Sequence, residues 1–180
     1  MEFYGATGTI GLLYAKHKGV SLNSDYPYVG GIQKNHQIPS GPKVRVHKVV
    51  AIDDFRRHKV KKIISKGHPV LAYMDVFESF LDFVGPEVYK ENYGKYSGSH
   101  IVLIVGYGVD AQGYDYWIVQ NTWGSDWGDK GFAKVRCGLV SIQSYADGVF
   151  LETFVSAALE QFLVTERGSN SLVRELTIFC

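Results

Sequence analysis

Blocks of apolar and polar positions along the chain predict two helices and six strands. Helical spacing is found in residues 6–18 and 55–66, and a glycine follows each segment where a helix would end. The strand-like runs are rich in β-branched residues and lie at 44–52, 69–76, 101–105, 114–120, 131–137 and 149–154. The aromatic segment 77–98 is predicted to be a long loop.

The first predicted helix has an apolar face without an obvious partner. Ala6, Ile10, Leu13, Tyr14 and His17 share one side of this helix. Only a few residues of the sequence precede it, so they offer little to pack against that face. We therefore expect the N-terminal region to be partly molten or prone to aggregation.

The second predicted helix has one apolar and one basic side. Val60, Ile63 and Ile64 face inward, and Asp53 or Asp54 can cap the N-terminus. The other side carries the basic residues Arg56, Arg57, Lys59, Lys61, Lys62 and Lys66. Such a run is either a solvated helix face or a nucleic-acid patch, and the net charge of +1 favours the solvated face.

The runs 101–105 and 114–120 predict a β-hairpin, because a short polar segment containing glycine joins them. His100 directly precedes the first run, and Asn121 directly follows the second. A hairpin brings the start of its first strand near the end of its second. We therefore expect His100 and Asn121 to be neighbours.

Composition narrows the classes of function. A length of 180 residues suits one domain or slightly more, and 46% hydrophobic residues indicate a globular protein. No apolar run approaches the roughly 20 residues that span a bilayer, and residues 1–8 do not resemble a signal peptide. The two cysteines, Cys137 and Cys180, form neither a disulfide framework nor a zinc site. We expect no cofactor, no metal, no nucleic acid and no membrane partner.

A histidine held by an asparagine is a device of nucleophilic catalysis. The imidazole must keep one tautomer and orientation while it takes a proton from a nucleophile. The side-chain carbonyl of Asn121 can accept a hydrogen bond from one ring N–H without adding charge. Trp123 and Trp127 follow closely and can keep water away from that bond.

These residues resemble the His/Asn portion of papain-like cysteine peptidases, the family of the cathepsins and plant vacuolar proteases. Residues 116–124 (YWIVQNTWG) resemble the family's YWIVKNSWG, and residues 127–132 (WGDKGF) its WGENGY. Residues 100–108 resemble the family's histidine strand, and 137–139 (CGL) its CGI. The resemblance implies that His100 is the general base and acid, that Asn121 orients it, and that Trp123 covers the pair.

The departures from the family pattern concern the nucleophile. The family places its cysteine in C-G-[SA]-C-[WY], roughly 130 to 150 residues before the histidine, and no such motif occurs here. The oxyanion-hole glutamine is missing with it. Cys137 matches a structural cysteine, Cys180 lies in the tail, and Ser99 points away from His100 on a strand. Ile101 stands where the family prefers a small residue and is expected to crowd the imidazole or the pocket beside it.

The resemblance implies an α+β fold: the right-hand β-barrel-like lobe of a papain-like peptidase with a remnant helix of the left lobe. We assign residues 1–31 to that remnant, 32–153 to the β-rich lobe with the His/Asn pair, and 154–180 to an atypical C-terminal tail. The family's location in vacuoles, in lysosomes or outside the cell is the corresponding expectation for this chain.

Two functions follow from this resemblance. The first is an N-terminally truncated or degenerate cysteine peptidase domain, inactive alone because it lacks the nucleophile. The alternative is a non-catalytic pseudo-peptidase that binds peptides or a protein partner. The expected partners are a peptide or protein ligand and a chain that supplies the missing lobe.

Overall fold

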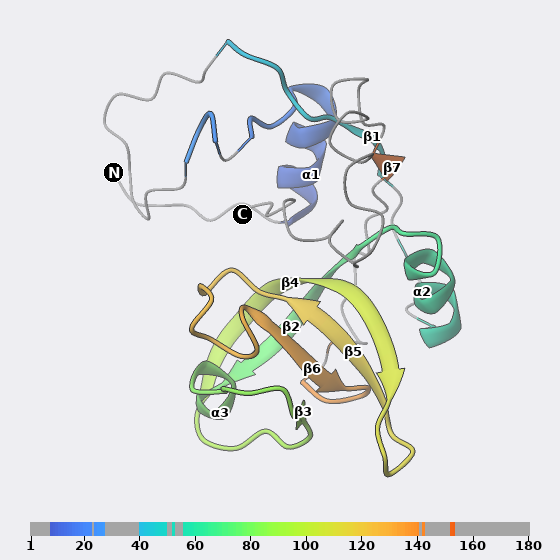
Figure 1. Ribbon diagram of the computed structural model, residues 1–180, viewed down its shortest axis with the longest axis vertical. Coiled ribbons are helices and arrows are strands. Elements are labelled where there is room, and N and C mark those ends of the chain that lie inside the picture. The colour runs from blue at the N-terminus through green and yellow to red at the C-terminus, as the bar shows by residue number, and fades with distance from the viewer. Residues whose placement is uncertain are drawn as a thin grey trace, which may run out of the picture. The chain divides into compact units, whose positions relative to one another are not determined.

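The computed structural model describes residues 8–22, 24–27, 40–49, 52, 56–140, 142 and 152–153 (Figure 1). The chain forms two compact units, one of residues 1–49 and 152–180 and the other of residues 50–151. The three-part division expected from the family resemblance stays a prediction.

The first unit contains helix α1 (Gly8–His17) and a two-stranded antiparallel sheet of β1 (Val46–Lys48) and β7 (Glu152–Thr153). The helix predicted at 6–18 is confirmed, and it ends as expected at Gly19, which has a φ of +78°. Leu12 and Ala15 are buried, whereas the face of Ile10, Leu13 and Tyr14 is exposed. Of the strand predicted at 44–52, Val46–Lys48 pair as a strand, and residues 50 and 51 lie outside the described ranges.

The second unit is built on a five-stranded sheet with the order β2-β4-β5-β6-β3. Its longer strands are β2 (Val70–Phe77), β4 (Tyr96–Val109), β5 (Asp115–Gln120) and β6 (Phe132–Arg136), each antiparallel to its neighbour. The two-residue strand β3 (Val88–Tyr89) pairs with β6 in parallel. Four strands predicted from the sequence are therefore confirmed, including both strands of the hairpin.

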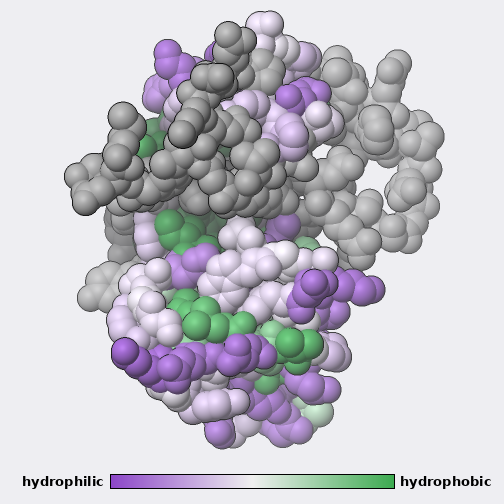
Figure 2. All heavy atoms as spheres, turned by 90° about the vertical axis from the view of Figure 1, so that its left-hand side faces the viewer, coloured by the Kyte–Doolittle hydropathy of each residue, from purple (hydrophilic) through white to green (hydrophobic). Residues whose placement is uncertain are grey.

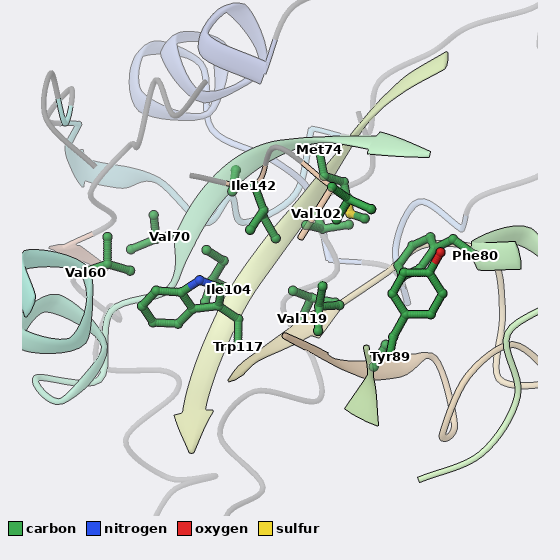
Figure 3. Packing of buried hydrophobic residues seen from close by; sticks show 14 of the residues in the cluster. Val60, Val70, Met74, Phe80, Tyr89, Val102, Ile104, Trp117, Val119 and Ile142 are labelled. Atoms are coloured by element: carbon green, nitrogen blue, oxygen red, sulfur yellow. The ribbon is translucent and has the colours of Figure 1, made fainter. Parts of the chain in front are cut away.

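The core lies on one face of this sheet. Every second residue along β4 and β5 is buried on that face: Val102 and Ile104 on β4, and Trp117 and Val119 on β5. Figure 3 shows how Val60 of helix α2 (Arg57–Ile64) lies at one end of this cluster, whereas Phe80 and Tyr89 lie together at the other. On the side drawn in Figure 2, apolar side chains reach the surface in small patches bordered by hydrophilic ones.

Helix α2 packs through Val60 and Ile63, as predicted from its spacing. Its N-cap is Arg56, which makes no side-chain capping bond. The predicted capping by Asp53 or Asp54 concerns residues that lie outside the described ranges. Lys61 and Arg57 bind Asp115 at the start of β5, at 2.7 and 3.3 Å, so part of the basic side secures the helix to the sheet.

The segment 77–98 is more ordered than the predicted loop. It holds helix α3 (Glu78–Leu81), strand β3 and the beginning of β4. Two of its aromatic residues pack inward: Phe80 is fully buried, and the Tyr89 ring meets it edge-to-face with 5.0 Å between centroids. The buried Ser79 hydroxyl lies 2.6 Å from the Tyr89 hydroxyl and joins the helix to the strand.

Gly106 and Asp110 have structural roles in the β4–β5 hairpin. A bulge interrupts the register between Ile104 and Gly106. A Cβ at Gly106 would lie 2.9 Å from the end of the Ile118 side chain, which would have to move to make room for a larger residue. At the tip, Asp110 Oδ1 accepts bonds from the backbone N–H of Gln112 and Tyr114 at 3.0 and 2.8 Å.

Candidate functional site

The side chain of His100 lies on the same face of β4 as the core residues, just beyond the end of the core. It has the same parity as the buried Val102 and Ile104, and its register partner on β2 is the buried Met74. Asn121 immediately follows β5, and its backbone N–H donates to the Gly131 carbonyl at 2.9 Å. The hairpin therefore brings the two side chains together, as the sequence predicted.

A hydrogen bond joins these side chains. His100 Nε2 lies 2.7 Å from Asn121 Oδ1. The same oxygen accepts the backbone N–H of Thr122 at 2.8 Å, which identifies it as the carbonyl oxygen of the amide. Because Oδ1 can only accept, Nε2 carries a hydrogen and donates it. In the neutral ring, Nδ1 then has the free lone pair and is the atom that can accept a proton.

Trp123 covers the imidazole. Its ring stacks on His100 with 4.7 Å between centroids and 26° between planes. Trp127 and Phe80 contact Trp123 edge-to-face at 5.3 and 5.8 Å. Trp127 is itself fixed by a 2.8 Å bond from its Nε1 to the Phe80 carbonyl. Both tryptophans singled out from the sequence therefore belong to this cluster.

Phe80 is the member of the site that sequence reasoning missed. It is fully buried and contacts both tryptophans, 4.9 Å from Trp127 and 5.8 Å from Trp123. It lies 20 residues before His100 among several aromatic residues, and no spacing rule distinguishes it from them. Only the packing of α3 against the turn after β5 reveals it.

Cys137 lies away from this site and has the wrong chemistry for a nucleophile. Its backbone N–H binds the Asp115 carbonyl at the start of β5, whereas Asn121 follows the end of that strand. Six residues of strand span roughly 20 Å. Burial raises the pKa of the Cys137 thiol to about 11, and the Asp115 charge contributes in the same direction. Cys180 lies outside the described residues.

Ser99 and Ile101 lie beside His100 on β4 but project from the opposite face of the strand. Ser99 is therefore not a substitute nucleophile. Because Ile101 projects from the face opposite His100, it does not crowd the imidazole, and the expected crowding of the pocket beside it stays a prediction. Ile101 instead pairs with Tyr73 across β2.

Two other features are absent from the described part of the chain. It contains no group of three or more His, Cys, Asp or Glu side chains arranged to hold a metal ion. Its helices include none that is both long and apolar enough to cross a membrane.

The model of the papain family of cysteine proteases matches residues 5–156. The chain belongs to this family, and its α+β fold is papain-like.

Named relatives agree with this assignment. A cathepsin L of Sarcophaga peregrina is 31% identical over 134 residues, which cover 71% of this chain and 40% of that protein. A cathepsin B-like protein, CP3, of Giardia intestinalis is 36% identical over 85 residues, or 44% of this chain and 28% of that protein. The chain thus spans less than half the length of these relatives.

Solved structures agree on the fold. The proform of the ragweed pollen allergen Amb a 11, a cysteine protease, superposes with a TM-score of 0.66 at 23% identity, over 81% of this chain and 46% of that one. The bromelain protease of Ananas comosus, solved with the E64 inhibitor, gives a TM-score of 0.60 at 25% identity, over 74% of this chain and 63% of that one.

Proposed function

We propose that this chain carries the proton-transfer half of a papain-family peptidase site, with His100 as general base and acid and Asn121 as its orienter. The observation that carries the proposal is the 2.7 Å contact between Nε2 and Oδ1. An imidazole held through Nε2 has Nδ1 free to take a proton from a thiol and to return it to the leaving amine. Trp123 supports this role because its stacked ring limits the access of water to the pair.

In the proposed reaction a thiolate attacks the carbonyl carbon of a peptide bond. The C–N bond breaks as the His100 imidazolium protonates the amine, and water then hydrolyses the thioester. Neither cysteine of these 180 residues is a candidate for the thiolate. Cys137 is half-buried with a raised pKa, and the sequence before Cys180 lacks the family motif. We therefore propose that the thiolate comes from protein outside these residues, and that they do not cleave peptides alone.

A non-catalytic peptide-binding module is the second candidate. One observation favours it: among the described residues, the edge of β4 that faces β5 has no strand partner from Tyr96 to Val102. Such an edge presents unpaired backbone groups to which an extended peptide can add. The proposed ligand of this site is accordingly an extended peptide segment, whether it is cleaved or only held.

The proposed partner in trans is a chain that supplies the rest of the lobe with the nucleophile. The exposed face of α1 formed by Ile10, Leu13 and Tyr14 supports this idea, because the three side chains are 57%, 42% and 45% exposed. Apolar side chains gathered on one helix face are typical of a surface that packs against another element.

Activity assays separate these proposals. The 180-residue chain is expected to give no turnover of fluorogenic peptides beyond that of its His100→Ala variant. Turnover that disappears in Cys137→Ala would contradict the assignment of the nucleophile. The same assay on a polypeptide extended through any upstream coding sequence is expected to give activity that His100→Ala abolishes. If the extended protein binds peptides but cleaves none, the pseudo-peptidase is the better description.

A further inference from the structure

The side of the β5–β6 strand pair that faces away from the core carries two basic side chains, Lys134 and Arg136. Trp117 of β5 pairs with Val135 of β6, and both are buried in the core. Their neighbours in the sequence therefore project from the opposite face of the sheet. Tyr116 is one of these neighbours, and it pairs directly with Arg136.

Each of the two basic side chains lies over a tyrosine ring. Lys134 Nζ is 5.9 Å from the centre of the Tyr116 ring, and the Arg136 guanidinium carbon is 3.9 Å from the centre of the Tyr114 ring. A cation within about 6 Å of a ring centre is attracted to the face of the ring. We define the basic face as the residues Tyr114, Tyr116, Lys134 and Arg136.

The Tyr116 ring is fixed by its contact with β4. It lies against the backbone of Gly108, where a Cβ would overlap with the ring. Gly108 is also the register partner of Tyr116, so the ring lies across the neighbouring strand. A ring held in this way offers Lys134 a fixed support. The basic face is therefore a preformed surface, and its two cations do not have to be ordered by a ligand.

The charges of the basic face are not neutralised by any described residue. Neither Lys134 nor Arg136 forms an ion pair within the described part of the chain, where Asp110 and Asp115 each bind a different lysine. An arginine stacked on a ring keeps its in-plane N–H groups available at the edge of the guanidinium. Two such cations side by side favour an anionic ligand.

The spacing of the two cations indicates which kind of anion fits. Residues two apart on a strand are separated by roughly 6.6 Å, and alternate side chains of an extended peptide have the same period. Carboxylates at alternate positions of such a peptide can therefore face both cations at once. Single-stranded nucleic acid fits less well, because its bases bind by stacking on open ring faces, and here a cation lies over each ring.

We propose that the basic face docks an extended acidic segment of a partner protein. Acidic side chains at alternate positions of this segment bind Lys134 and Arg136. The surface is separate from the His100–Asn121 pair, because Asn121 follows the far end of β5 and His100 lies on the core side of β4. A partner docked here leaves the histidine site uncovered, so this proposal does not depend on whether the chain cleaves or binds peptides.

The test compares three blocked heptapeptides binding to the complete chain. The first, acetyl-Gly-Thr-Glu-Thr-Glu-Thr-Gly-amide, has alternate glutamates, and the second has the same composition with adjacent glutamates. The third replaces both glutamates of the first by glutamine. At low salt we expect the alternating peptide to bind about threefold more tightly than the adjacent one and about five- to tenfold more tightly than the glutamine one. High salt should reduce both differences.

Variants locate the binding surface. Lys134→Gln and Arg136→Gln each remove one cation and are expected to weaken binding of the alternating peptide about threefold or more. Lys62→Gln makes the same change of charge at an exposed position of α2 and is the matched control, which should retain the affinity. In the unchanged chain, the peptide should shift the amide signals of residues 134 and 136 more than those of α2, a readout that needs no variant.

Four outcomes would overturn the proposal. Equal affinity for alternating and adjacent glutamates would rule out recognition of an extended acidic segment. A thymidine trinucleotide, which carries two phosphates, would rule out specificity for a peptide if it bound as tightly as the alternating peptide. Affinity that survives both Lys134→Gln and Arg136→Gln would place the ligand elsewhere. Binding of none of the peptides would exclude docking of acidic segments by this chain.

Discussion

At the residue scale, Cys137 is controlled by burial. Its thiol is half-buried, and its pKa is raised to about 11, chiefly by burial and also by Asp115. At pH 8 the thiolate fraction is then about 100-fold lower than for an ordinary cysteine. We expect iodoacetamide to alkylate Cys137 slowly in the folded chain and rapidly in urea. Mass spectrometry of the peptide that contains Cys137 measures both rates, and fast labelling in the folded chain would contradict the prediction.

Asn121 offers a second test at this scale. Asn121→Ala removes the acceptor of the Nε2–H bond, so His100 is expected to lose its fixed tautomer. The ¹⁵N shifts of the two ring nitrogens report this directly, since they differ strongly in a fixed tautomer and converge when the tautomers exchange. The loss of the buried acceptor is also expected to lower the free energy of unfolding by about 1–2 kcal/mol. Unchanged shifts would mean that another group holds the ring.

The pairing of His100 with Asn121 could be predicted from the sequence because a hairpin fixes which strand ends meet. The place of Phe80 in the site could not be predicted from the sequence, because its contacts with Trp123 and Trp127 depend on how α3 packs. The local sequence pattern therefore identifies the pair of His100 and Asn121, whereas the residues packed around this pair can be identified only from the tertiary structure.

At the element scale, the turn between β5 and β6 contains a residue in an unfavourable conformation. Lys130 is exposed and has a φ of +55°. This region is unfavourable for most side chains but is tolerated by asparagine, which the family motif has at this position. Lys130→Asn is expected to raise the free energy of unfolding by about 0.5 kcal/mol, measured by urea denaturation. Lys95→Asn, at an exposed lysine without a positive φ, should have a smaller effect.

The attachment of α2 to β5 makes stability depend on pH. The hydrogen bond from Lys61 is the main cause that holds the pKa of Asp115 below its ordinary value of 3.8. A carboxyl whose pKa is lower in the folded state stabilises the fold at higher pH and loses that effect as the pH falls through the folded pKa. Lys61→Met is therefore expected to cost about 0.5 kcal/mol at pH 7 and progressively less below about pH 4.

Lys62→Met is the control for this effect, because Lys62 lies on the exposed side of the same helix. It should change the free energy of unfolding little at either pH. Urea midpoints measured from pH 2.5 to 7 decide between the two variants. A cost of Lys61→Met that remains constant over this range would assign it to lost packing on Tyr107, which Lys61 also contacts at 5.3 Å.

Elements with a clear period could be predicted, and elements formed by packing could not. The helix at 57–64 and the strands β2, β4, β5 and β6 each follow from apolar spacing. By contrast, α3 and β3 have four and two residues, too few for any period to be recognised. They form because Phe80 and Tyr89 are buried together and Ser79 binds the Tyr89 hydroxyl. The sequence pattern of this aromatic segment therefore predicts a loop, although it contains a short helix and a short strand.

At the scale of the whole molecule, the described residues of the two units differ in how much apolar surface they bury. Within the part of the chain that the structure describes, eighteen buried residues form the hydrophobic cluster, and all of them belong to the unit of residues 50–151. Helix α1 of the other unit buries Leu12 and Ala15 and exposes Ile10, Leu13 and Tyr14. Local stability follows the density of buried contacts, so the units are expected to open independently and with different free energies.

Hydrogen exchange tests this difference. We expect the amides of α1 to exchange about 100-fold or more faster than those of β4 and β5, whose side chains Ile104, Trp117 and Val119 are fully buried. Helix α2 is the control for secondary structure, because it is also short but is anchored by Val60 and Ile63 in the core. It should exchange more slowly than α1. Equal protection of α1 and the hairpin would mean that the exposed face of α1 costs little stability, and would remove the support that this face gives to a partner in trans.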